Sequence, residues 1–182
     1  MMSEVKIGER EKRGRGGAGK VVVLAVVFVG LLVPVGIAVT LLYLAQPMRV
    51  EGVAMLPALA DGDGILLRRR FGGLKRGDII VFRYPPEPSK SYLKRIVGLP
   101  GEVVEVRGGR VLIDGSPLDE PYLDPKRNQA PGELAPVRLS EESYFVMGDN
   151  RDDSNDSRSW GPLPREFIYG KYAARYWRAR GD

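Results

Sequence analysis

The hydrophobic pattern of the chain consists of one long uncharged run followed by many short apolar stretches. Residues 21–45 carry no charged side chain. These 25 residues exceed the ~20 that cross the hydrocarbon core of a bilayer as a helix. The run is also longer than the ~7–15 apolar residues of a cleavable signal peptide. We therefore expect an uncleaved transmembrane helix over 21–45.

After residue 45, short runs rich in Val, Ile, Leu, Tyr and Phe are separated by Gly, Pro and Asp, a pattern typical of β-strands. The predicted strands are 65–69, 79–84, 92–97, 102–107, 110–113, 144–147 and 168–176. Gly108-Gly109 and Asp114-Gly115 indicate tight turns, and 85–88 indicates an extended loop. Residues 121–140, with four prolines, indicate a surface excursion. We expect no further helix of ordinary length, and one all-β domain with coiled or closed sheets over 46–182.

Charge is concentrated at the N-terminus. Residues 1–20 hold six basic and three acidic residues and are rich in glycine, so we expect a disordered tail. Basic residues before a span favour a cytoplasmic N-terminus, which predicts a single-pass protein of the cytoplasmic membrane with 46–182 outside. Removing the tail from the totals of 28 basic and 23 acidic residues leaves 22 and 20. The domain is therefore nearly balanced in charge, and no nucleic-acid partner is expected.

The chain has neither cysteine nor histidine. This excludes disulfides, thiol nucleophiles, imidazole metal ligands and the Ser-His-Asp arrangement. A general base would have to be a carboxylate, a lysine, a tyrosine or water. We expect no metal and no cofactor.

Lys94 falls inside the predicted strand 92–97, whose other residues apart from Arg95 are apolar. With a period of two, it shares a face with Tyr92 and Ile96, while Arg95 points to the other face. Burial on an apolar face disfavours the charged ammonium and lowers the pKa of a lysine, and a neutral amine can accept a proton from a hydroxyl. The alternative is a lysine whose stem lies over the sheet with its ammonium in water.

A polar segment at 147–162 is rich in Asp, Asn and Ser and contains Arg151 and Arg158. An oxygen-ligand calcium site is one interpretation, but the spacing lacks the Gly and Glu of a calcium-binding EF-hand loop. We favour a loop folded on its own ion pairs.

Three stretches together carry a family resemblance. The first, 50–63, contains Met55-x-Pro57-x-Leu59 and closes on Gly-Asp; the second, 92–101, reads Tyr-x-Lys-Arg-x-x-Gly-x-Pro-Gly; the third begins Gly-Asp-Asn-Arg-Asp at residue 148. In this order, after an apolar anchor, they resemble type I signal peptidases, the membrane-anchored serine proteases that cut signal peptides from exported proteins. The resemblance spans about 42–174 and implies a signal-peptidase-like ectodomain of coiled sheets or a barrel.

The resemblance implies roles for individual residues. Lys94 would be the general base, Ser154 would hydrogen-bond the lysine, and Asp156 with Arg158 would form a supporting salt bridge. Residues around the nucleophile position would hold the oxyanion or the substrate: Gly52, Val53, Met55 and Pro57. The partners implied are signal peptides of exported preproteins, with small residues at the cleavage site, docked by strand addition beside 50–59, and membrane lipid.

Ala54 stands where the family has its nucleophilic serine, and no Ser, Thr or Cys occurs between 47 and 64. By analogy with other serine proteases, what remains without the nucleophile is at most ~10³–10⁴-fold over water. The chain as written is therefore predicted to be inactive. The alternatives are a laboratory substitution, a naturally inactive homologue that binds signal-peptide-like segments, and a sequence error or an unrecognised nucleophile. Ala58 and Asp153 also depart from the family, which often has Thr and Asn there.

Two other classes of protein are weighed against this interpretation. Self-cleaving repressors share a Ser-Lys chemistry, but they would need a soluble DNA-binding domain where this chain has an apolar span. A purely structural surface protein would not explain why Lys94 and the Ser154 segment occur together.

Overall fold

The computed structural model describes residues 16–129 and 132–179, and the chain divides into two compact units, one ending at Tyr43 and the other beginning at Leu44. The first contains helix α1 (Gly16–Leu44), with Pro34 inside it. Its window Gly19–Gly36 is long and apolar enough to cross a membrane. Between Val21 and Val35, the large apolar side chains that the structure describes are exposed, as expected for a lipid-facing helix. The helix begins at Gly16 rather than at residue 21, and residues 1–15 of the predicted tail lie outside the described part.

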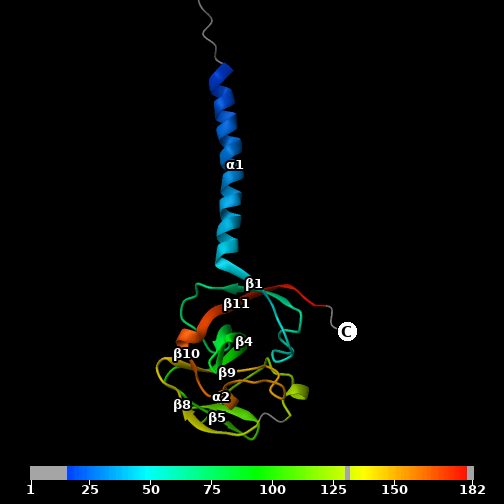
Figure 1. Cartoon of the computed structure of the whole chain (residues 1–182), viewed down its shortest axis with the longest axis vertical. Helices are drawn as coiled ribbons and strands as arrows, with labels where there is room; N and C mark the ends of the chain where they lie inside the picture. Colours follow the sequence, from blue (N-terminus) through cyan, green and yellow to red (C-terminus); the bar gives the residue numbers. More distant parts are fainter. Residues whose placement is uncertain (1–15, 130–131, 180–182) are drawn as a thin grey trace, which may run out of the picture. The chain divides into compact units, whose positions relative to one another are not determined.

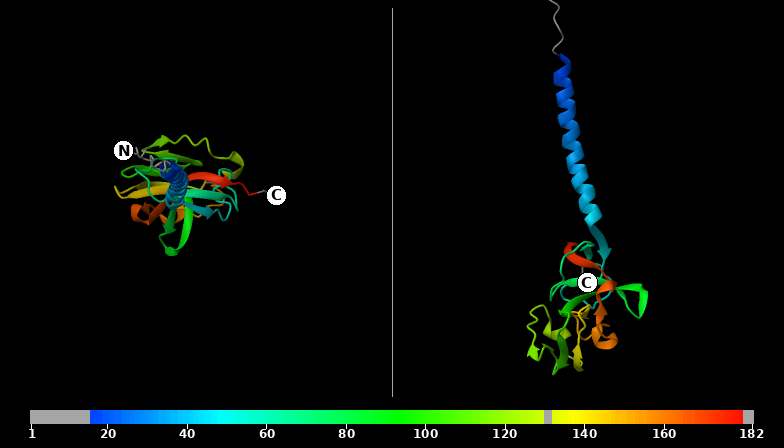
Figure 2. Two further views of the ribbon diagram at one scale, coloured as in Figure 1. Left: turned by 90° about the horizontal axis from the view of Figure 1, so that it is seen from above. Right: turned by 90° about the vertical axis from the view of Figure 1, so that its left-hand side faces the viewer.

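The second unit is built from two antiparallel sheets (Figure 1). The larger has the order β1 (Ala45–Arg49), β2 (Gly64–Arg68), β11 (Ile168–Trp177), β3 (Ile79–Tyr84), β4 (Glu87–Gly98), β9 (Ser143–Met147) and β10 (Leu163–Pro164). The smaller has the order β7 (Ser116–Pro117), β6 (Arg110–Ile113), β5 (Val103–Arg107) and β8 (Leu134–Arg138). The smaller sheet lies at the end of the unit opposite to β1 and β11 (Figures 1 and 2).

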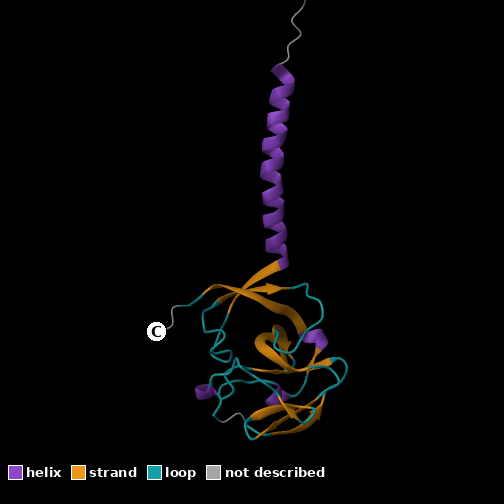
Figure 3. Ribbon diagram, turned by 180° about the vertical axis from the view of Figure 1, so that it is seen from behind, coloured by secondary structure: helices purple, strands orange, loops and turns teal. Residues whose placement is uncertain are grey.

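In the described part of the second unit, helical structure is limited to short pieces (Figure 3). They are α2 (Ser157–Trp160) and the 3₁₀ turns η1 (Pro125–Arg127) and η2 (Arg165–Phe167). The predicted all-β class is therefore confirmed.

The seven predicted strands are all present, and 79–84 and 110–113 match their observed bounds. The extended loop predicted at 85–88 is wrong. Pro85 and Pro86 form a tight turn, and Glu87 already pairs with Tyr84 across it. The excursion predicted at 121–140 is wrong in part, because β8 lies within it and pairs with β5. Strands β1, β7 and β10 were not predicted.

The predicted turns are confirmed. Gly108 and Gly109 have φ of 55° and 79° and connect Arg107 to its partner Arg110. Positive φ at both central residues is the requirement of the type I′ hairpin turn, whose twist matches that of the strands. Asp114 and Gly115 make the same kind of turn between β6 and β7.

Strand β3 lies at the centre of the core. Ile79 and Val81 pack into a cluster that includes Met55 and Leu67, whereas Ile80 and Phe82 pack into a second cluster on the other face. A strand buried on both faces reads as a continuous apolar run, which explains Ile-Ile-Val-Phe. Strand β4 pairs with β3 along this buried strand, and β4 carries Lys94.

Candidate active site

The segment from Val50 to Asp63 forms a closed loop between β1 and β2. Val50 N donates to Asp63 O and Gly62 N to Val50 O, both at 2.8 Å. Gly52 N donates to the carboxylate of Asp61 at 2.7 Å, with Gly52 at a φ of 86° that favours glycine. Two apolar side chains of the loop, Met55 and Leu59, are buried in the core with residues of β2. The loop is therefore anchored on both sides of Ala54.

The last strand of the chain supports the same loop through Asp63. This carboxylate is fully buried and accepts hydrogen bonds from Ala60 N at 3.0 Å, Ala179 N at 2.9 Å and Arg175 Nη1 at 2.9 Å. A buried carboxylate is tolerated when it is paired and hydrogen-bonded in this way. Asp63 was part of the recognised Gly-Asp pair, but its link to residues 175–179 could not be read from the sequence.

The polar segment after β9 lies directly against the nucleophile position. Asn150 N donates to Ala54 O at 2.9 Å, and its side-chain Nδ2 donates to Val53 O at 3.2 Å. Gly148 allows this close approach, because a Cβ there would lie 2.6 Å from Ala54 O and 2.3 Å from Ser154 Oγ. The backbone at 53–54 is thus fixed by the same segment that contains Ser154.

Lys94 lies in the middle of β4 with 6% of its surface exposed. Its Nζ is 5.4 Å from the centre of the Tyr92 ring, so the two share a face as predicted. It makes no hydrogen bond or ion pair with any described residue. Burial lowers the pKa of Lys94, and the carboxylate of Asp156 acts against it less strongly. An amine held in this state is suited to accept a proton.

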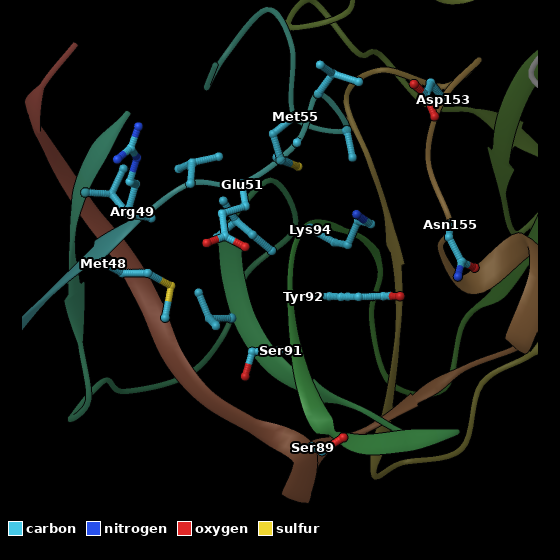
Figure 4. A pocket seen from close by; sticks show the side chains of 17 residues that line it. Met48, Arg49, Glu51, Met55, Ser89, Ser91, Tyr92, Lys94, Asp153 and Asn155 are labelled. Atoms are coloured by element: carbon cyan, nitrogen blue, oxygen red, sulfur yellow. The ribbon is translucent and has the colours of Figure 1, made fainter. Parts of the chain in front are cut away.

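A cleft of about 760 Å³ brings Lys94 and Ala54 together. Gly52, Val53 and Met55 also line it, as do Glu51, Leu93 and Asn155. Figure 4 shows Lys94 between Glu51 on one side and Asp153 with Asn155 on the other. Pro57, predicted to bind substrate, does not line this cleft; its side chain is exposed, and its peptide bond with Leu56 is cis.

Asp156 and Arg158 form the predicted salt bridge. The carboxylate of Asp156 accepts Nε of Arg158 at 2.8 Å, Nη2 at 2.9 Å and Gly148 N at 3.0 Å. Burial by itself would raise the pKa of Asp156, but the Arg158 guanidinium and the Gly148 N–H outweigh it and keep the pKa below its ordinary value. Asp156 therefore stays ionised and orders the chain around Gly148.

Ser154 lies beside this ion pair. Its Oγ is buried near Asp156 and contributes to the low pKa of that carboxyl, but it has no well-oriented hydrogen bond to a described residue. The hydrogen bond expected between Ser154 and Lys94 is not formed in this structure. The role of Ser154 toward the lysine stays a prediction.

A buried charged network on the other face of β4 was not predicted. Arg95 pairs with Asp149 at 2.6 Å and stacks on the ring of Tyr122, 4.1 Å from its centre. The Tyr122 hydroxyl donates to Glu120, which pairs with buried Arg151 at 2.5 Å. Arg95, Asp149 and Arg151 lie inside recognised motifs, whereas no pattern in the sequence singles out Glu120.

The arrangement defines what chemistry the cleft offers. It contains a buried amine with a lowered pKa, and the Ala54 N–H donates to no acceptor in the described part of the chain. Such an amide can hold a developing oxyanion. The methyl group of Ala54 supplies no nucleophile. Among residues 16–129 and 132–179, no group of three or more carboxylates converges to hold a metal ion.

Comparison with known proteins identifies a family and several relatives of this chain. A model of the family described as signal peptidase, peptidase S26, matches residues 19–177. The chain is 37% identical over 147 residues to signal peptidase I of Leptolyngbya laminosa, covering 74% of this chain and 70% of the relative. It is 36% identical over 163 residues to signal peptidase I P of Bacillus subtilis subsp. natto, covering 84% and 83%. A crystal structure of a signal peptidase I from Enterococcus faecalis is 30% identical with a TM-score of 0.49, covering 56% of this chain and 98% of that one.

Proposed function

The chain belongs to the signal peptidase family, peptidase S26, and from this premise we propose that its cleft binds signal peptides of exported preproteins. The observation that carries the proposal is the position of Ala54 and Lys94 in one cleft, with the lysine buried and its pKa lowered. A serine at 54 would place a hydroxyl in the same cleft as an amine whose pKa is lowered by burial, which is the requirement for a Ser-Lys dyad.

In this proposal each residue of the cleft has one task. Lys94 takes the proton of a nucleophile at position 54, and the N–H of residue 54 holds the oxyanion. Gly52, Val53 and Met55 form the floor beside the scissile bond. Asp156 and Arg158 keep Gly148 and Ser154 in contact with the loop. Ala54 makes the chain inactive as written, so it binds these peptides and releases them uncut.

The substrate is an extended peptide with small residues next to the cleavage site. The exposed segment 51–53 beside the cleft is suited to pairing with such a strand. Met55 and Leu93 line the cleft, and in this proposal they leave room for small side chains next to the scissile bond. In the first candidate the site is that of a peptidase, which cleaves when residue 54 is serine. In the second candidate the loss of the serine is natural and binding of signal-peptide-like segments is the whole function; Ala54 itself is the observation that favours it.

Binding by the unaltered chain tests this proposal. A fluorescent peptide with an Ala-x-Ala site should bind the full chain in micelles with saturable anisotropy and remain intact. The matched control is the same peptide with tryptophan in place of both alanines, which the cleft should not accept. Equal binding of both peptides would contradict a specific signal-peptide site.

The proposal also includes orientation: a single span, α1, in the cytoplasmic membrane, with residues 1–15 inside and the β domain outside. It rests on the apolar window Gly19–Gly36 and on the basic residues before it. Protease added to intact protoplasts should degrade the β domain and leave an N-terminal fragment. Protection of the domain in sealed protoplasts would contradict this orientation.

A further inference from the structure

We propose that Arg68, Arg69 and Arg70 form a binding surface for anionic phospholipid headgroups at the point where the chain leaves the bilayer. The inference rests on the membrane anchor of the proposed function and adds a second contact with the membrane, made by the β domain itself. The three arginines follow one another at the end of β2, and all three are exposed.

These arginines differ from most of the other guanidinium groups of the domain in having no carboxylate partner among the described residues. Seven other arginines form ion pairs: Arg76, Arg95, Arg107, Arg127, Arg151, Arg158 and Arg175. Within the triplet, Arg69 has a neutral partner, because its Nε donates to Gln46 Oε1 at 2.8 Å. Three adjacent guanidinium groups without a carboxylate partner produce a local positive potential, and their fork geometry suits phosphate oxygens.

Strand pairing puts this triplet next to the exit from the span. Residues 21–44 are uncharged and helical, and 24 residues extend about 36 Å. The hydrocarbon core is only about 30 Å thick, so the end of the run reaches the headgroup region. The next residue, Ala45, is the β partner of Arg68, and Gln46 contacts Arg69. Paired strands lie ~4.8 Å apart, so both arginines are held within one strand spacing of the emerging chain.

Lipid phosphate is favoured over other anionic partners by this continuity. Arg68 and Arg69 lie beside the first residues that follow the span, so phospholipid headgroups are the anions nearest to them along the chain. The neighbouring cation Lys171, opposite Arg68, is neutralised by Asp78 at 2.7 Å and adds little. The surface therefore depends on the three arginines alone, and it can be removed by substituting them.

The absence of cysteine from the chain makes a site-specific test possible. Gly72 is exposed, two residues after Arg70, and no heavy atom lies within 4 Å of an added Cβ. A fluorophore on Gly72→Cys is measured in the full chain reconstituted in vesicles that carry a headgroup-attached spin-label quencher. Quenching should be strong with phosphatidylcholine plus phosphatidylglycerol, weaker with phosphatidylcholine alone, and reduced by salt. In the Arg68→Gln, Arg69→Gln, Arg70→Gln variant, the docking equilibrium should fall by roughly 10²-fold.

Two controls are made on the smaller sheet. The first removes three positive charges there, and the second places the fluorophore there. Arg107, Arg110 and Arg138 are exposed on the smaller sheet, and their replacement by Gln should leave quenching at residue 72 unchanged. A fluorophore on Ser116→Cys, also on that sheet, should be quenched weakly. If the chain floats with vesicles but the quenching depends neither on lipid charge nor on the three arginines, the proposed headgroup-binding surface is wrong and the membrane anchor still holds. A chain that floats with neither kind of vesicle overturns the anchor, and the lipid surface with it.

Discussion

Arg95 donates from Nε and Nη2 to both oxygens of Asp149, at 2.8 and 2.6 Å, from the face of β4 opposite to Lys94. Neighbouring residues of a strand point to opposite faces. The bidentate pair therefore fixes the backbone of β4 where it carries the lysine into the cleft. It also fixes the start of the polar segment, since Asp149 is followed by Asn150, which binds Ala54 O.

The first prediction concerns this ion pair. Asp149→Asn removes the charge that compensates Arg95, of which only 12% is exposed. Breaking a buried ion pair on one side destabilises a protein by about 3–5 kcal/mol. Denaturant unfolding of Asp149→Asn should show a loss of this size.

The control is Glu87→Gln, which removes the exposed partner of Lys90. Because water screens that pair, its loss should change the free energy of unfolding by less than about 1 kcal/mol. Equal effects of the two substitutions would contradict a structural role for the Arg95–Asp149 pair.

The second prediction concerns Gly148. In Gly148→Ala, the new methyl group would lie 2.3 Å from Ser154 Oγ and 2.6 Å from Ala54 O. Either the polar segment or the loop at 54 must move, and such overpacking costs about 1–3 kcal/mol. Gly72→Ala is the matched control, since it meets no atom within 4 Å, and it should be neutral or slightly stabilising. A neutral Gly148→Ala would contradict the close packing of these segments.

The third prediction concerns the pH dependence of stability caused by Lys94. Burial lowers the pKa of Lys94 in the folded chain, whereas in the unfolded chain it titrates near 10.4. As the pH falls below about 10.4, the unfolded chain binds a proton that the folded chain does not, so stability decreases with falling pH. The decrease ends once the pH is below the folded pKa.

Lys94→Met removes this pH-dependent contribution of the lysine to the free energy of unfolding. The variant should be more stable than the parent at neutral pH, and the difference should shrink toward zero as the pH rises through about 10.4. Thermal unfolding over this pH range measures it. A constant difference at all pH values would mean that Lys94 titrates normally in the folded protein.

The sequence was sufficient where the information is local. Period-two alternation placed Lys94 with Tyr92 and Arg95 on the other face, and this is confirmed. Asp156 and Arg158 are two residues apart, and their salt bridge was predicted from the motif. The apolar run was recognised as a helix because no tertiary contact is needed to define it.

The contacts that assemble the site are long-range and could not be predicted from one sequence. The bond from Asn150 to Ala54 O and the bond from Arg175 to Asp63 each join segments about a hundred residues apart. Strand β8 is short, lies beside the residues 130–131 that the structure does not describe, and contains Pro136, so its composition resembles a loop. It forms because β5 offers an open edge to pair with.

The last measurement tests whether the site is complete except for its nucleophile. Ala54→Ser adds one hydroxyl at a half-buried position on the cleft wall. We predict that this variant cleaves a preprotein with an Ala-x-Ala site, faster than the parent chain by roughly 10⁶-fold, the scale of losing a serine nucleophile elsewhere. The rate should rise with pH as Lys94 loses its proton, at a lower pH than an exposed lysine requires. Ala54→Ser combined with Lys94→Ala should be inactive. A folded, peptide-binding Ala54→Ser protein that leaves the preprotein intact at every pH would contradict the account.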